Sequence, residues 1–201
     1  EKGINAGVTV LYGAFEAEGG KEKFAAGHSG GAGDALTKST SGADVAEGDF
    51  GLASIFVEKV INDKFTVGLD YVPMSAESET TENTQGSLVN KVQVDFEDLT
   101  TLYGMINLNE NVYAKAGLMR VDVVTNENLA TGGAYGNTEL DGVMVGLGYV
   151  KDLDEGMFVR MEGTYMDFDG ATVKNANDST KSISVDGIEG YGAKLSIGKS
   201  F

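Results

Sequence analysis

Apolar and polar side chains alternate along much of this chain with a period of two, which is typical of β-strands because successive side chains of a strand point to opposite faces. The C-terminal stretch illustrates the pattern. Tyr191, Ala193, Leu195, Ile197 and Phe201 share one parity, whereas the residues of the other parity are small, polar or charged. One face of this strand is therefore apolar and carries an aromatic residue at each end.

Seven further segments have a strand-like pattern, so eight strands are predicted. In chain order they are Asn5–Ala17, Asp49–Val60, Lys64–Val72, Val92–Asn107, Val112–Val124, Glu139–Val150, Met157–Phe168 and the final stretch that ends at Phe201. In the third of these, Phe65, Val67, Leu69 and Tyr71 form one apolar face. The chain thus predicts an all-β protein made of hairpins.

The fourth segment changes parity near Asp98, which predicts a β-bulge there. Before this point the aligned apolar residues are Val92, Val94 and Phe96. After it, the residues that we expect on the outward face are Leu99, Thr101, Tyr103 and Met105.

Short and long connections alternate between the strands. The short turns are predicted at Asn62-Asp63, Asn109-Glu110 and Asp152–Gly156. The long connections are Gly19–Gly48, Met74–Asn90, Thr125–Thr138 and Asp169–Lys181. A soluble sandwich has no reason to place every long connection at one end, whereas outer-membrane barrels have short turns on one side and long loops on the other.

These features resemble the small outer-membrane family of OmpX, the OmpA membrane domain and the opacity-type surface proteins. The resemblance implies one domain, residues 1–201, folded as an eight-stranded antiparallel up-and-down transmembrane β-barrel with extracellular long loops and periplasmic turns. It also implies a place in the bacterial outer membrane, among outer-membrane lipid and lipopolysaccharide. The terminal strand, with Phe201 at its end, resembles the signal that the barrel-assembly machinery reads in this family.

The composition narrows the alternatives. The chain has 201 residues, which suits a single domain, and no cysteine, which excludes disulfides. Its formal net charge of −16 argues against binding of nucleic acid, because phosphates would be repelled. No stretch approaches the roughly 20 apolar residues of a membrane helix, but a barrel strand needs only about 9–11 alternating residues. No secretory leader opens the chain, so we expect a mature chain from which a signal peptide has been removed.

Five tyrosines fall near strand ends, where an aromatic girdle would meet the membrane interface. They are Tyr12, Tyr71, Tyr149, Tyr165 and Tyr191. The alternative interpretation is that tyrosine is simply common in strands.

Six charged residues are predicted to point into the barrel. They are Glu58, Asp70, Lys115, Arg160, Glu162 and Lys194. An eight-stranded barrel has an interior just wide enough for side chains to fill, so we expect these charges to pair as a polar plug. The alternative is a gate or an ion path. If Lys115 points inward, Arg120 points outward and must lie above the apolar band.

Catalysis and metal binding have little support in the sequence. His28 is the only histidine and lies among glycines in the first long connection, and no serine–histidine–acid set or zinc site can be assigned around it. The lipid A palmitoyltransferase of similar architecture also uses a loop histidine, but it has an N-terminal amphipathic helix that residues 1–8 are too short and glycine-rich to form. Weak calcium candidates are Asp167, Asp169 and Asp178, with Asn175 and Asn177 beside them; acidic loops are more often only solvated.

The sequence therefore favours a structural or surface-interaction protein, without enzymatic activity or cofactor, whose long loops are available to an extracellular ligand or receptor. A small-solute or ion channel of the OmpW type is the alternative and would need an apolar or open lumen. A soluble lipocalin-type carrier would need apolar residues inside and polar residues outside. A lipid-modifying barrel enzyme is the remaining class.

Overall fold

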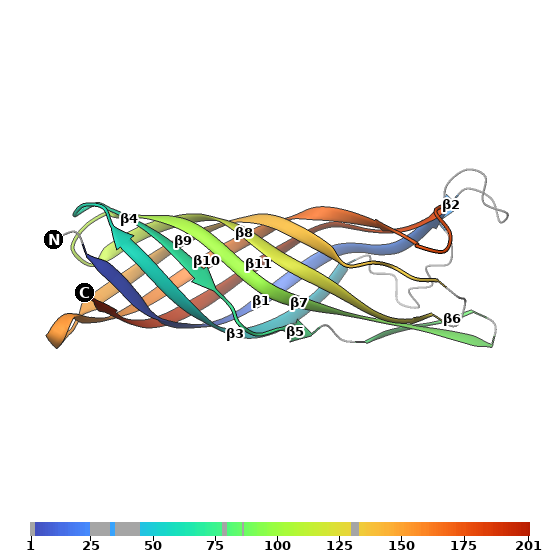
Figure 1. The fold of residues 1–201 in the computed structure, drawn as a ribbon, viewed down its shortest axis with the longest axis horizontal. Coiled ribbons are helices and arrows are strands. Elements are labelled where there is room, and N and C mark those ends of the chain that lie inside the picture. Colours follow the sequence, from blue (N-terminus) through green and yellow to red (C-terminus); the bar gives the residue numbers. More distant parts are fainter. Residues whose placement is uncertain (1–2, 25–32, 35–44, 78–79, 86, 130–132) are drawn as a thin grey trace.

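The chain forms a closed barrel of antiparallel strands in the computed structural model (Figure 1). Residues 3–24, 33–34, 45–77, 80–85, 87–129 and 133–201 are described. The eight strands of the wall are β1 (Ile4–Phe24), β3 (Val45–Val60), β4 (Phe65–Tyr71), β7 (Leu88–Asn107), β8 (Val112–Leu129), β9 (Thr138–Asp152), β10 (Met157–Lys174) and β11 (Lys181–Ser200). Shorter elements are β2 (Gly33–Asp34), β5 (Ala76–Glu77), β6 (Thr81–Gln85) and the 3-10 turn η1 (Asp154–Gly156).

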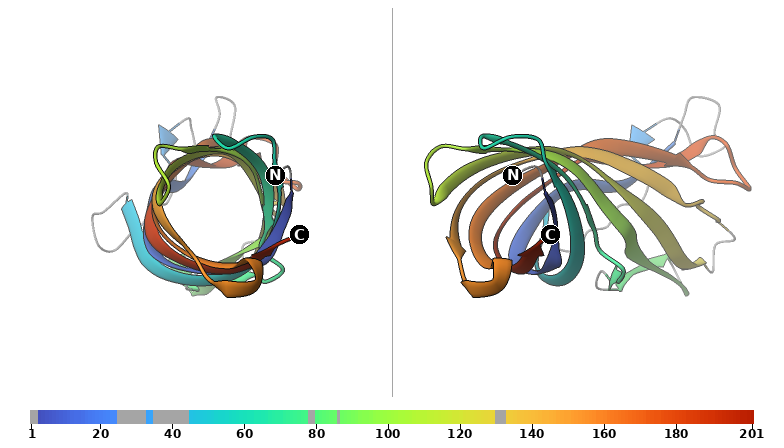
Figure 2. Two further views of the ribbon diagram at one scale, coloured as in Figure 1. Left: turned by 90° about the vertical axis from the view of Figure 1, so that its left-hand side faces the viewer. Right: turned by 60° about the vertical axis from the view of Figure 1, so that its left-hand side comes forward.

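Each wall strand pairs with its neighbours in the chain, and the last strand pairs with the first. The order around the wall is β11-β10-β9-β8-β7-β4-β3-β1, and the β1–β11 pairing closes it into the ring seen end-on in Figure 2. At the seam Ile4 and Phe201 exchange backbone hydrogen bonds, with N···O distances of 3.2 and 2.8 Å. The predicted eight-stranded up-and-down topology is confirmed.

Both termini and the three short turns lie at one end of the barrel, here called the turn rim (Figure 1). Two of these turns share one device: the side-chain oxygen of Asn62 or Asn109 accepts hydrogen bonds from two backbone N–H groups that follow it. Asparagine mimics a backbone turn in this way. At η1 the left-handed Glu155 (φ 59°) precedes Gly156 (φ 75°). The opposite end is called the loop end.

The outward face near the turn rim is apolar. Leu118, Leu147, Met161 and Leu195 are representative, each with more than half of its surface exposed. Alternation places charged, polar and small side chains inside at the same level, as the sequence predicts, and with them the buried rings of Phe56 and Phe158. We call this zone the apolar band.

Polarity reverses toward the loop end, where apolar side chains fill the interior. Leu11, Met119, Met144 and Met166 form one buried cluster. A second cluster around Val121, Val123 and Leu140 follows it. This second pattern, with apolar residues inside and polar residues outside, was not predicted from the sequence.

Several strands are longer than predicted. β1 has 21 residues and β11 has 20, against the roughly 9–11 that span a membrane. The strands therefore occupy parts of the segments that were predicted as loops; β10 continues to Lys174 and β8 to Leu129. In these extensions the outward residues are polar, which hides the apolar alternation on which the prediction relied.

β7 contains the predicted bulge. The register advances three residues on β7, from Glu97 to Thr100, against two on β8, and Asp98 has a φ of 54°. The predicted facing after the bulge is wrong. Four residues that were expected to point outward lie inside the barrel: Leu99, Thr101, Tyr103 and Met105. Leu102 and Ile106 are exposed in their place, because the polar end of Tyr103 has a partner inside the barrel.

Among the described residues no helix is long and apolar enough to cross a membrane.

Candidate functional site

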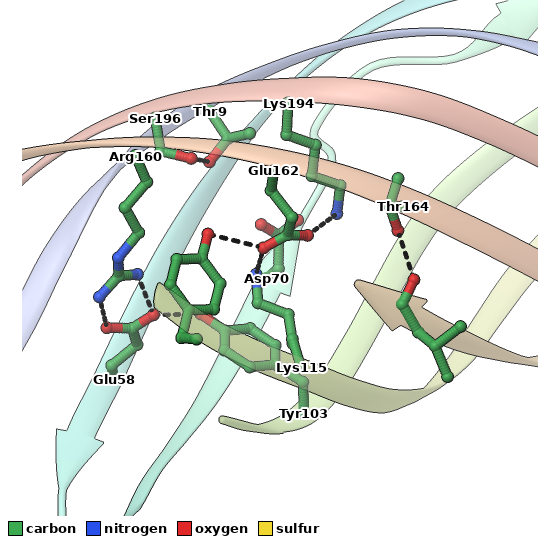
Figure 3. A network of polar contacts seen from close by, with 12 residues as sticks. Thr9, Glu58, Asp70, Tyr103, Lys115, Arg160, Glu162, Thr164, Lys194 and Ser196 are labelled. Carbon is green, nitrogen blue, oxygen red and sulfur yellow. Dashed lines mark hydrogen bonds and ion pairs between the residues drawn. The ribbon is translucent and has the colours of Figure 1, made fainter. Parts of the chain in front are cut away.

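The charged lumen is the most distinctive site in the barrel (Figure 3). Arg160 of β10 reaches across to Glu58 of β3, and the two Nη–Oε distances are 2.6 and 2.9 Å. Asn5 Nδ2 donates to the same carboxylate at 3.0 Å, and the Tyr103 hydroxyl donates at 2.8 Å. A carboxylate accepts up to about four hydrogen bonds, so Glu58 is fully satisfied although its side chain is completely buried.

Aromatic rings surround the Arg160 guanidinium. Its central carbon lies 4.4 Å from the ring centroid of Phe158, 5.7 Å from that of Phe56 and 5.6 Å from that of Tyr113. Arginine is attracted to aromatic faces at such distances. The rings hold the guanidinium in place and exclude solvent from the Arg160–Glu58 pair.

A second set of polar contacts centres on Glu162, two residues further along β10. Lys115 Nζ lies 2.8 Å from Glu162 Oε2, and the Tyr113 hydroxyl donates to the same oxygen at 2.9 Å. Lys194 of β11 approaches Oε1 at 4.0 Å. Because Lys115 Nζ also sits 4.4 Å from the Tyr103 ring, the Glu162 and Glu58 contacts form one continuous network.

Asp70 is held apart from these pairs. Its carboxylate accepts a hydrogen bond of 3.0 Å from Ser54. With Lys194 and Thr101 it lines a void of about 10 Å³, next to the first apolar cluster. Such a volume admits no more than about one water molecule. The lumen is therefore filled where the polar network meets the apolar cluster.

Glycines make room for the two inner tyrosines. A Cβ on Gly68 would overlap the Tyr103 ring, and a Cβ on Gly148 would overlap the Tyr113 ring. Neither tyrosine was recognised as a lumen residue from sequence. The signal that could have indicated their inward position is a glycine on one strand opposite a tyrosine on the neighbouring strand. Gly68 lies opposite Tyr103 in register, and Gly148 lies opposite Tyr113.

The structure places all six predicted lumen charges inside the barrel and brings them together from five strands, β3, β4, β8, β10 and β11. Three are acidic and three are basic, so the set is formally neutral. Arg160 pairs with Glu58 and not with Glu162, its neighbour on β10. The arrangement can hold the wall strands together and block the lumen. Most of its polar groups bind one another, whereas Arg160 Nε donates no hydrogen bond, and Glu162 Oε1 accepts none, among the described residues.

The predicted girdle tyrosines all lie on outward strand faces. Tyr12, Tyr149, Tyr165 and Tyr191 are exposed and Tyr71 is half-buried. Tyr165 and Tyr191 face each other in register on β10 and β11. The Tyr71 hydroxyl donates to Asp98 at the bulge, at 2.5 Å.

Arg120 points outward beside the loop-end border of the apolar band, as expected once Lys115 faces inward. It donates to Asp141 through Nε at 2.7 Å and Nη2 at 3.1 Å. This hydrogen-bonded guanidinium holds the pKa of the Asp141 carboxyl below its usual range. Both residues lie one outward position beyond the apolar Leu118 and Val143.

The weak calcium candidates do not converge. Asp167 and Asp169 lie on β10, and Asp178 lies in the following turn, where its carboxylate accepts hydrogen bonds from Thr180. Within the described part of the chain no group of three or more such side chains is placed to hold a metal ion. His28 lies outside the described residues.

No family model matches the chain, and no curated protein sequence matches it. Solved structures do. The outer membrane protein AlkL in lipid bilayers matches with a TM-score of 0.60 at 13% identity, over 100% of this chain and 90% of that one. OprG from Pseudomonas aeruginosa matches with a TM-score of 0.51 at 13% identity, over 100% and 97%. The fold is that of an outer-membrane β-barrel. The attachment invasion locus protein Ail of Yersinia pestis, with a TM-score of 0.45 at 11% identity over 98% and 99%, is another of these barrels.

Proposed function

We propose that this protein is a non-conducting barrel of the bacterial outer membrane, with a structural or surface-interaction role. The turn rim faces the periplasm and the loop end faces the cell exterior. The apolar band supports the membrane location, because it surrounds the barrel where the backbone is fully paired.

One observation carries the non-conducting role: the ion-paired network that crosses the lumen. Arg160 and Glu58 close one level, and Glu162 with Lys115 closes the next. The void of about 10 Å³ beside Asp70 and Lys194 is small enough to support a closed lumen at this level. Because the charged groups of the network pair mainly with one another inside the barrel, the role that we propose is not enzymatic.

The strand extensions support a surface role. Beyond the apolar band they are polar outside and apolar inside, which is the arrangement of a protein surrounded by water. We infer that they form a stalk that carries the loop-end connections away from the membrane. The partners that follow from this role are outer-membrane lipid and lipopolysaccharide around the band, the assembly machinery during biogenesis, and an extracellular ligand or receptor at the loop end.

Expression in a Gram-negative host tests this proposal. We expect the protein in the outer-membrane fraction, with faster gel migration before boiling than after. Protease added to intact cells should cut only the connections at the loop end. Recovery in the soluble fraction, or cleavage confined to the short turns, would contradict the proposed location or orientation.

The apolar interior of the loop end favours a second candidate, passage of small apolar solutes as in the OmpW-type alternative. Leu11, Met119, Met144 and Met166 would form the inner end of such a path. β4 ends at Tyr71, and beyond it the wall between β3 and β7 contains the short β5, whose two residues Ala76 and Glu77 pair with β7. Uptake of an apolar dye by cells that express the protein, abolished by Met144→Lys, would favour this candidate over a closed stalk.

A further inference from the structure

Three strands that run toward the turn rim end their outward face in the same way, with two apolar residues followed by a lysine. The three sets are Ile55, Val57 and Lys59 on β3; Leu147, Tyr149 and Lys151 on β9; and Leu195, Ile197 and Lys199 on β11. Each lysine is the next outward position beyond the apolar band. We call Lys59, Lys151 and Lys199 the lysine belt.

The other border of the band carries the opposite charge. There the first charged outward residue is acidic on five strands: Glu16, Asp49, Asp141, Asp167 and Glu189. The exception is Arg120 on β8, whose guanidinium is bound to Asp141. Charge on the outward face is therefore segregated along the barrel axis, basic at the turn rim and acidic at the loop end.

The lysine belt is exposed and has no protein partner in the described part of the chain. All three side chains are exposed, and no ion pair joins them to a described acidic residue. Asp63 and Glu110 at the same rim lie in the turns, past the strand ends, and Asp152 is the last residue of β9, of opposite parity to Lys151. The ammonium groups therefore border the apolar band directly.

We propose that the lysine belt binds the phosphate groups of anionic phospholipids in the leaflet at the turn rim. The inference rests on the proposed membrane location. A lysine at the border of a membrane-facing surface lays its apolar stem along the band and places its ammonium at headgroup level. At that depth the available anion is the lipid phosphate, and attraction to an anionic membrane surface strengthens binding by roughly fivefold for each basic residue at low salt.

The net charge of the chain makes a preference for anionic lipid informative. At −16 the whole protein is repelled by anionic lipid, so a preference for such lipid must come from a local basic feature. The acidic residues at the loop-end border of the band repel anionic lipid. The lysine belt thus favours insertion with the turn rim next to anionic phospholipid.

Lipid retention by the full chain tests the assignment. The protein is refolded in a nonionic detergent, incubated with equal amounts of phosphatidylglycerol and phosphatidylcholine, and examined by native mass spectrometry. We expect at least tenfold more phosphatidylglycerol on the wild type. The variant Lys59→Gln/Lys151→Gln/Lys199→Gln should lose this preference, whereas replacement of the same three lysines by arginine should keep it.

Lys91→Gln/Lys174→Gln/Lys181→Gln is the matched control, because it removes the same charge at the loop end; it should retain the wild-type ratio. Equal ratios for the wild type and the belt variant would overturn the assignment, as would displacement of the lipid by millimolar inorganic phosphate. A barrel that folds but shows no lipid preference contradicts only the proposed binding of lipid phosphate by the lysine belt. A chain that forms no heat-modifiable barrel in any lipid contradicts the proposed membrane role.

Discussion

Arg160 binds both carboxylate oxygens of Glu58 across the lumen, from β10 to β3, at 2.6 and 2.9 Å. The two residues are 102 positions apart in the chain. Their strands are not neighbours in the wall, since β1 and β11 lie between them. The pair therefore braces opposite parts of the barrel, which neighbouring-strand hydrogen bonds alone do not do.

Loss of one partner should destabilise the barrel strongly. Arg160→Ala leaves Glu58 charged and buried, at a cost of about 3–5 kcal/mol. The double variant Arg160→Met/Glu58→Gln should recover much of this loss, because no charge is left unpaired. Urea unfolding followed by gel mobility measures the effect. Arg160→Met/Glu162→Gln is the control, and it should not recover, since Glu58 remains without its guanidinium.

The glycine opposite Tyr103 should not tolerate a side chain. Gly68→Ala places a methyl group against the phenol ring and moves its hydroxyl away from Glu58, which should cost about 1–3 kcal/mol. Gly163→Ala is the matched control, because a Cβ at this outward glycine meets nothing within 4 Å. Equal unfolding midpoints for the two variants would show that Tyr103 is not held as described.

The Arg120–Asp141 pair should make the stability of the folded barrel depend weakly on pH in the acidic range. Because the folded-state pKa of Asp141 is below its unfolded value of about 3.9, the pair stabilises the barrel above that value and loses its effect as the pH falls through the folded-state pKa. The difference in unfolding midpoint between the wild type and Asp141→Asn should therefore shrink below about pH 4. Both side chains are exposed, so high salt should also shrink it. An unchanged difference at low pH would exclude this origin.

Phe201 should matter more for assembly in cells than for the finished barrel. Phe201 is 76% exposed, while its backbone pairs with Ile4. Phe201→Ala keeps the backbone bonds, so refolding into detergent should be unchanged while yield in the outer membrane falls. Deletion of Phe201 removes the bonds as well and should also lower stability. If Phe201→Ala lowers both yields equally, the ring acts through packing and not as a recognition signal.

The eight strands and the bulge at Asp98 were predictable because apolar and polar side chains alternate wherever the outward face of a strand belongs to the apolar band. The same rule failed after the bulge. Tyr103 and Met105 resemble membrane-facing residues in sequence, and the contacts that hold Tyr103 inside come from the distant Glu58 and Gly68. Strand ends were underestimated because the outward face of the extensions is polar.

The charged residues of the lumen were predictable from parity, since each lies opposite apolar neighbours on its strand. Their partners were not. Which acidic residue pairs with Arg160 depends on the stagger of the strands around the ring. This stagger brings Glu58 of β3 closer to the guanidinium than Glu162, which lies on β10 with Arg160. The roles of Tyr103 and Tyr113 depend on the same stagger.

Planar-bilayer recording of the native protein tests the closed lumen most directly. We expect no sustained conductance over a range of voltages, because the network around Glu58 and Glu162 fills the barrel. The recorded protein must first show the heat-modifiable migration of a folded barrel. Steady openings whose size changes with Arg160→Ala or Lys194→Ala would contradict the closed lumen and show that ions pass through the network.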